Sequence, residues 1–218
     1  MFPSLEVRWF CGGSTPAEVV EWFGGGERTP EEEPQRVDHY LRLGDTDALG
    51  IKLREGRLEI KQRYCQQGVV RFHEHATGVV EHWRKWSFLL TETGGGLADT
   101  LTPLSSWIGV QKERRLRKYQ LTEDGRLVAI PAGEYPERGC AAELTTIQVG
   151  AQEWWSLGLE ALGEESSLAE TLMLTARHVL APGYLPFSFD ATHSYGYPRW
   201  LALLEWREDS RVQHESRP

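Results

Sequence analysis

Cysteine is scarce in this chain, which has only Cys11, Cys65 and Cys140 among its 218 residues. The three lie far apart, their number is odd, and no two of them form a CxxC pair. The sequence therefore excludes a disulfide framework and a structural zinc site. Free thiols are typical of a reducing compartment, and we expect a cytoplasmic protein.

Long hydrophobic runs are also missing. No apolar stretch is long enough to cross a bilayer, and the N-terminus lacks a basic region followed by a hydrophobic core. We therefore expect no membrane partner.

Basic residues are in the minority, because the chain has 24 Lys and Arg but 32 Asp and Glu, which gives a net charge of −8. A general nucleic-acid binder needs a broad basic surface, so we expect no nucleic-acid partner, although an acidic shell can still enclose a basic pocket.

Three short runs of alternating polar and apolar residues occupy residues 37–63, which read VDHYLRLGDTDALGIKLREGRLEIKQR. The GDTD and REGR segments between the runs supply turn residues. Successive side chains of a strand point to opposite faces, so one face is apolar and the other carries Lys52, Arg54, Lys61 and Arg63. Such a face is either the solvated outer side of an antiparallel sheet or a cationic concave surface for an anionic ligand.

Most of the remaining chain also has the pattern of strands. We predict them over residues 5–10, 69–75, 79–90, 107–121, 127–130 and 140–149, the last of these being the final strand of a barrel. Helices are predicted after Thr15 and over residues 167–180, and the acidic segment 27–35 is predicted to be a loop. Eight or nine strands in mostly meander order favour an α+β fold that is mainly antiparallel β: a closed or nearly closed eight- to nine-stranded barrel with a few flanking helices.

A single domain is expected over residues 1–206, since a chain of this length can bury one core. Residues 207–218 are polar and are predicted to form a frayed tail. Residues 185–206 are rich in Phe, Tyr and Trp beside prolines. We expect this aromatic segment to pack over the barrel, to form a short helix from Pro198 and to close one mouth of the lumen.

The central run resembles the middle of the CYTH superfamily, the triphosphate tunnel metalloenzymes. That family has a tyrosine-leucine strand, an arginine-x-arginine strand, a hairpin and a strand that ends in a lysine. The matching residues here are Tyr40-Leu41, Lys52-x-Arg54, Glu55-Gly56 and Lys61. The resemblance extends over roughly the first 180 residues, since Lys112-x-Arg114 resembles a later lysine-x-arginine strand and residues 141–147, with Glu143, resemble the closing acidic strand.

The acidic half of the family pattern is thinner. The family's first strand carries a glutamate-x-glutamate-x-lysine motif, and the matching positions here are Ser4, Glu6 and Arg8. Only the second glutamate is therefore present, and arginine replaces the lysine. A further family glutamate corresponds to Glu160, whereas Gly158 stands where a partner acid could be.

The resemblance implies a phosphohydrolase that acts on inorganic triphosphate or an organic triphosphate inside a cationic barrel lumen with a divalent metal. The residues that it assigns to phosphate binding are Arg8, Lys52, Arg54, Lys61, Lys112 and Arg114. Glu6, Glu143 and Glu160 would hold Mg²⁺ or Mn²⁺, which are hard cations that take oxygen ligands. Glu6 and Lys61 would be the catalytic residues.

Two other functions stay open. The first is a catalytically inactive CYTH-like barrel that binds a phosphorylated or polyanionic ligand, which Ser4 and Gly158 favour. The second is an interaction protein whose basic strands face solvent, so that their Lys and Arg side chains do not converge. The sequence identifies neither the phosphate compound nor the oligomeric state.

Overall fold

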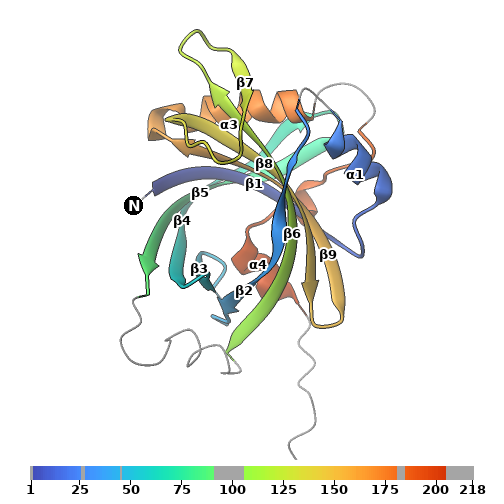
Figure 1. Ribbon diagram of the computed structural model, residues 1–218, viewed down its shortest axis with the longest axis vertical. Helices are drawn as coiled ribbons and strands as arrows, with labels where there is room; N and C mark the ends of the chain where they lie inside the picture. Colours follow the sequence, from blue (N-terminus) through green and yellow to red (C-terminus); the bar gives the residue numbers. More distant parts are fainter. Residues whose placement is uncertain (1, 26–27, 45, 91–105, 181–184, 205–218) are drawn as a thin grey trace, which may run out of the picture.

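Strands dominate the computed structural model of the protein, which describes residues 2–25, 28–44, 46–90, 106–180 and 185–204 (Figure 1). The predicted tail 207–218 lies outside the described residues. None of the described helices is long and apolar enough to cross a membrane. The elements follow one another as β1 (Phe2–Gly12), α1 (Ala17–Gly24), β2 (Glu31–Leu41), β3 (Leu49–Arg54), β4 (Arg57–His73), β5 (Ala76–Leu89), β6 (Trp107–Leu121), β7 (Leu127–Ile130), β8 (Arg138–Val149), β9 (Gln152–Gly163), η1 (Glu165–Ser167), α3 (Leu168–Val179), η2 (Ala191–His193) and α4 (Tyr197–Leu203).

Eight of these strands form a closed antiparallel barrel. Their order is β2-β3-β4-β5-β1-β9-β8-β6, and β2 pairs with β6 to close the ring. The remaining strand, β7, pairs with the far end of β6 beyond the part that β2 covers. The predicted fold class, an α+β protein built on a closed eight- to nine-stranded barrel with flanking helices, is confirmed.

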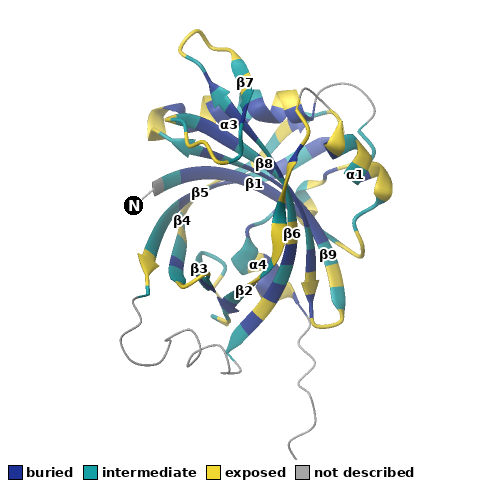
Figure 2. Ribbon diagram, in the orientation of Figure 1, coloured by how far each residue is buried: buried dark blue, intermediate teal, exposed yellow. Residues whose placement is uncertain are grey.

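The barrel wall separates an apolar outer layer from a charged interior. Alternate residues of β1 point outward, and Leu5, Val7 and Trp9 pack in a hydrophobic core with residues of α1 and α3. The residues between them, Glu6 and Arg8, line a cavity inside the barrel. Strand β1 is therefore buried on both faces over most of its length (Figure 2), and its charged side chains are screened from bulk water.

The aromatic segment enters one end of the barrel. Trp200 of α4 is fully buried and stacks on Phe10 of β1, with ring centroids 4.9 Å apart. Tyr197 stacks on Tyr40 of β2 at 5.4 Å. A second core cluster gathers these rings with inward residues of β6 and β8, including Val110. The helix expected from Pro198 begins one residue earlier, and its aromatic side chains fill this end of the lumen.

Three predictions about strands are wrong. The run that ends at Arg63 and the segment 69–75 were expected to be separate strands, but both belong to the single strand β4. The acidic segment 27–35 was expected to be a loop, but β2 already begins at Glu31. The acidic residues pair along β6, where Glu33 lies opposite Arg114, and a register shift between Glu33 and Arg36 accommodates Pro34. The strand at residues 140–149 is not the last of the barrel, because β9 follows it and joins β8 to β1.

Candidate functional site

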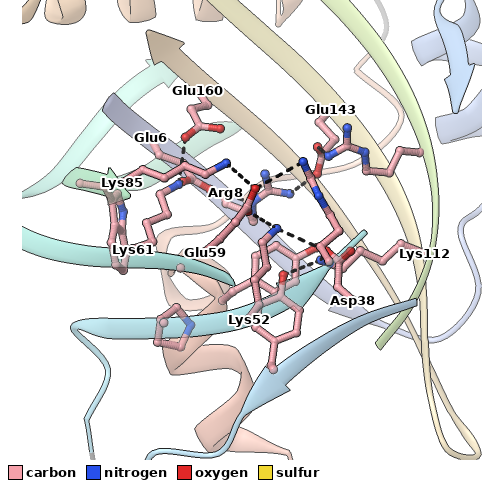
Figure 3. Close-up of a pocket in the computed structure, with 18 residues that line it drawn as sticks. Glu6, Arg8, Asp38, Lys52, Glu59, Lys61, Lys85, Lys112, Glu143 and Glu160 are labelled. Carbon is pink, nitrogen blue, oxygen red and sulfur yellow. Dashed lines mark hydrogen bonds and ion pairs between the residues drawn. The ribbon is translucent and has the colours of Figure 1, made fainter. Parts of the chain in front are cut away.

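The barrel encloses a cavity of about 140 Å³ near its middle. All eight barrel strands contribute residues to this cavity, as does the first turn of α4 (Figure 3). Every predicted site residue lines it: Glu6, Arg8, Lys52, Arg54, Lys61, Lys112, Arg114, Glu143 and Glu160. The basic residues therefore converge, and the expectation that they face solvent separately, as an interaction protein would require, is wrong.

The charge of the cavity differs from that of the protein. Seven cationic and five acidic side chains line it, whereas the whole chain has a net charge of −8. The lining thus carries a positive excess inside an acidic protein. A recess with low-dielectric walls concentrates the field of its charges, so this lumen favours anions over cations.

Arg8 is the most connected of the cationic side chains and is almost wholly buried. Its Nε donates to Glu6 at 2.9 Å, and its Nη1 donates to Glu143 at 2.9 Å and to Ser156 at 3.1 Å. Burial alone would lower the pKa of Arg8, but Glu143 and Glu6 outweigh it and hold that pKa well above its usual value. Arg8 is therefore a permanent cation that is fixed in place by two carboxylates.

Lys61 connects two carboxylates of neighbouring strands. Glu6 and Glu160 lie opposite each other in the β1–β9 ladder, and the Lys61 ammonium donates to both of them, at 2.9 Å for Glu160. Burial opposes the charge of Lys61, but Glu160 and Glu6 raise its pKa above the usual value. Burial also opposes the ionisation of Glu160, yet the Lys61 charge and hydrogen bond hold the pKa of that carboxyl below its usual value.

Asp38 is the acidic centre of a second cluster, and sequence reasoning missed it. Its side chain is fully buried and accepts hydrogen bonds from Lys112 at 3.1 Å, Lys52 at 3.4 Å and Arg36 at 3.1 Å. Burial lowers the pKa of Lys52 and that of Lys112 to about 8, although the Asp38 carboxylate works in the opposite direction. The signal for Asp38 was its place two residues before Tyr40, on the same face of the strand.

A third cluster involves Lys85, which was also missed. Glu59 lies 3.2 Å from Lys85, 3.0 Å from Lys52 and 3.4 Å from Arg54. Burial alone would raise the pKa of Glu59, but the charges of Lys52, Lys85 and Arg54 outweigh this effect and lower that pKa to about 2. Lys85 lies two residues after Trp83 on β5 and shares its face, and both residues line the cavity. This shared face was the signal that could have identified Lys85.

Three donors of the cavity lining are buried and have no hydrogen-bond partner among the residues that the structure describes. They are Arg54 Nε, Trp83 Nε1 and Tyr197 Oη. A buried polar group without a partner costs about 1–3 kcal/mol, so these atoms lower the stability of the protein. The lysines and arginines of the lining, in contrast, supply a donor-rich surface that suits an anion with several oxygen atoms.

The predicted metal ligands do not fit a divalent ion in this arrangement. Both oxygens of Glu6 accept from cations, Arg8 and Lys61, and Glu143 pairs with Arg8 and Arg114, each at 2.9 Å. Within the described ranges, no three His, Cys, Asp or Glu side chains come together so that they could hold a metal ion. The carboxylates are thus neutralised by the protein's own cations.

Gly158 also has a role that the sequence did not indicate. It was considered as a position that a partner acid could occupy, but the guanidinium of Arg8 covers it. A Cβ atom at Gly158 would lie 2.5 Å from Arg8 Cζ. The space that the missing side chain leaves is therefore filled by Arg8.

No family model matches the chain, and no curated protein matches its sequence significantly.

Proposed function

We propose that the barrel lumen binds a small compound that carries several phosphate groups. The observation that supports this proposal is the convergence of seven cationic side chains from five strands on one cavity. A phosphate monoester carries a charge of about −1.5 to −2 at neutral pH, and Arg side chains bind phosphate oxygens through two parallel hydrogen bonds. An eight-stranded barrel is wide enough to hold one small ligand. The resemblance to the CYTH superfamily also supports the proposal, since it implies phosphate binding in the lumen.

The exposure of the cations suggests how the ligand is received. Lys85 and Lys61 are the most accessible, with side chains 36% and 28% exposed, whereas Lys112 is only 4% exposed. A ligand that enters would first meet the accessible lysines and would then approach the buried cluster around Asp38. The three free cysteines agree with a cytoplasmic location.

Metal-dependent hydrolysis of a triphosphate is the second candidate. The observation that favours it is the pairing of Glu6 with Glu160 across the β1–β9 ladder. Two carboxylates, together with phosphate oxygens and water, are a usual set of ligands for Mg²⁺. For this function Lys61 would have to move from between the two carboxylates. Binding without hydrolysis needs no such movement, and we therefore place it first.

The test is calorimetric titration of the protein with tripolyphosphate at moderate salt, in EDTA and then with Mg²⁺ or Mn²⁺, followed by a phosphate-release assay. The matched variants are Arg114→Ala and Arg115→Ala. Arg114 lines the cavity, whereas its neighbour Arg115 points to the other face of β6 and pairs with Glu32 at 3.2 Å.

We expect tripolyphosphate to bind in EDTA, and we expect Arg114→Ala alone to weaken the binding. If the folded wild-type protein does not bind tripolyphosphate under any of these conditions, the proposed function is wrong. Release of phosphate only when a metal is present would establish the second candidate.

A further inference from the structure

We propose that Lys61 is the resident counter-ion of the Glu6–Glu160 carboxylate pair, so that the lumen receives its ligand without a divalent metal. The part that concerns the ligand rests on the proposed function. The part that concerns the counter-ion rests only on the geometry of the three side chains and can be tested without any phosphate compound.

The position of Lys61 is built by three strands. Strand β5 lies between β4, which carries Lys61, and β1, which carries Glu6. The Lys61 side chain crosses β5 and passes near Trp83, whose ring centroid is 5.4 Å from Nζ. Its ammonium then reaches the carboxylates of both Glu6 and Glu160. A cationic group held over an aromatic ring and bonded to two carboxylates is strongly fixed.

Three of the four oxygens of the two carboxylates already accept hydrogen bonds from the protein's own cations. One oxygen of Glu6 accepts a hydrogen bond from Arg8, and the other accepts one from Lys61. Oε1 of Glu160 accepts a second hydrogen bond from Lys61. A divalent ion between these two carboxylates would stand close to the ammonium, and two cations a few ångströms apart repel each other strongly where water is scarce. The ion could bind only if Lys61 moved away.

Lys61 can serve the pair and the ligand at the same time. An ammonium has three N–H donors, and the two carboxylates take two of them. The third donor is left for an oxygen of the bound anion, which agrees with the partial exposure of this side chain, 28%. In this arrangement the acidic residues position a phosphate-binding lysine, and they are not ligands of a metal.

The experiment measures binding of Mn²⁺ alone, by the loss of the free-ion signal in electron paramagnetic resonance, to the wild-type protein and to Lys61→Met. Methionine keeps an unbranched apolar stem and removes the charge. We expect no saturable site for Mn²⁺ in the wild type. In Lys61→Met the carboxylate pair loses its ammonium, and we expect one saturable Mn²⁺ site that the wild type lacks. Mn²⁺ should then raise the melting temperature of this variant and leave that of the wild type unchanged.

The control is the double variant Lys61→Met/Glu160→Gln, which should lose the Mn²⁺ site that Lys61→Met gains. One saturable Mn²⁺ site in the wild type that Glu160→Gln abolishes would overturn the proposal. Failure of a folded Lys61→Met protein to bind Mn²⁺ would also overturn it. If that variant does not fold, the titration of the wild type decides the question alone.

Tripolyphosphate titrations separate this inference from the proposed function. We expect the wild type to bind tripolyphosphate in EDTA with an affinity that Mn²⁺ does not increase. If tripolyphosphate binds only when Mn²⁺ is present, the inference is wrong and the proposed function stands. If tripolyphosphate does not bind at all, the proposed function is wrong, while the Mn²⁺ titrations still decide the role of Lys61.

Discussion

The guanidinium of Arg8 lies directly against the backbone of Gly158. Both Arg8 on β1 and Glu143 on β8 are ladder neighbours of Gly158 on β9. The ion pair between them, 2.9 Å long, therefore spans a strand at the one position where no side chain intervenes. The central ion pair of the lumen depends on this glycine.

Gly158→Ala should consequently disturb Arg8. The new Cβ would lie 2.5 Å from Arg8 Cζ, and because Arg8 is fixed by Glu6, Glu143 and Ser156, it cannot move without breaking a buried hydrogen bond. We expect the free energy of unfolding to fall by about 1–3 kcal/mol, together with a loss of tripolyphosphate affinity. Urea denaturation measures the first effect and calorimetry the second.

Gly12→Ala is the matched control, because this glycine lies on the same ladder and its Cβ would meet nothing closer than 4.0 Å. Its effect should stay within about 0.5 kcal/mol. Equal urea midpoints for Gly158→Ala and the wild type would contradict the role assigned to Gly158.

The pH dependence of binding should reflect Lys52 and Lys112. Burial lowers both pKa values to about 8 in the free protein, and a bound anion would raise them, so the complex holds more protons than the free protein above that pH. Affinity for tripolyphosphate should therefore be greatest below pH 8 and should fall as the pH rises. Calorimetry in buffers of different ionisation enthalpy should detect proton uptake on binding.

The same two lysines should also make the free energy of unfolding depend on pH. Unfolded lysines titrate near 10.4, so between about pH 8 and that value the unfolded chain binds more protons than the folded one. The contribution of these two groups to the free energy of unfolding should rise with pH across this window. Lys52→Arg, whose guanidinium does not titrate there, should make both dependences shallower. Affinity that does not change across the window would exclude this coupling.

Asp38→Asn should destabilise the protein at pH 7. The carboxylate is completely buried and accepts hydrogen bonds from three cationic side chains, those of Arg36, Lys52 and Lys112. Loss of one partner of a buried charge cluster typically costs about 3–5 kcal/mol. Asp124→Asn is the control, since Asp124 is half-exposed in a hairpin and pairs only with Arg126 and Thr122 among the described residues. Similar melting temperatures of the two variants would contradict the prediction.

Tyr197→Phe should show the opposite pattern. The Tyr197 hydroxyl is buried without a hydrogen-bond partner among the described residues, so its removal should leave the free energy of unfolding unchanged or slightly higher. The buried hydroxyl is not exposed to the lumen, so the affinity for tripolyphosphate should also stay unchanged. Tyr135→Phe, at a side chain that is 84% exposed, should change neither quantity. A clear loss of stability in Tyr197→Phe would argue that the hydroxyl has a structural partner.

The barrel could be predicted because most of its strands alternate polar and apolar residues. Two segments escaped this rule for physical reasons. The start of β2 has no apolar residue to alternate, and it forms a strand because its glutamates meet arginines of β6 such as Arg114. In β9 the inward face carries Ser156 and Gly158, which are too small to give a clear pattern, although the outward Trp155 and Leu157 are buried.

The sequence could predict which residues of each strand face the site. It could not predict the ion pairs that connect residues of different strands. Alternation correctly placed Lys52, Arg54 and Lys61 on one face, and the cavity brings them together. It could not indicate which carboxylate neutralises which cation, because partners such as Lys61 and Glu160 are 99 residues apart. Tyr197 comes from a segment outside the alternating strands, so only the folded chain places it beside Lys112, at 3.9 Å from ring centroid to Nζ.

The pairing of β1 with β5 and β9 also determines when the lumen can form. Strand β1 pairs with β5, at residues 76–89, and with β9, at residues 152–163, and both strands are far from it in the sequence. Closing such long loops is slow, because chain entropy is lost before the contacts form. We therefore expect slow folding, in milliseconds to seconds. The same late closure gathers the cations of five strands around one lumen, so an anionic ligand would bind and stabilise only the completed barrel.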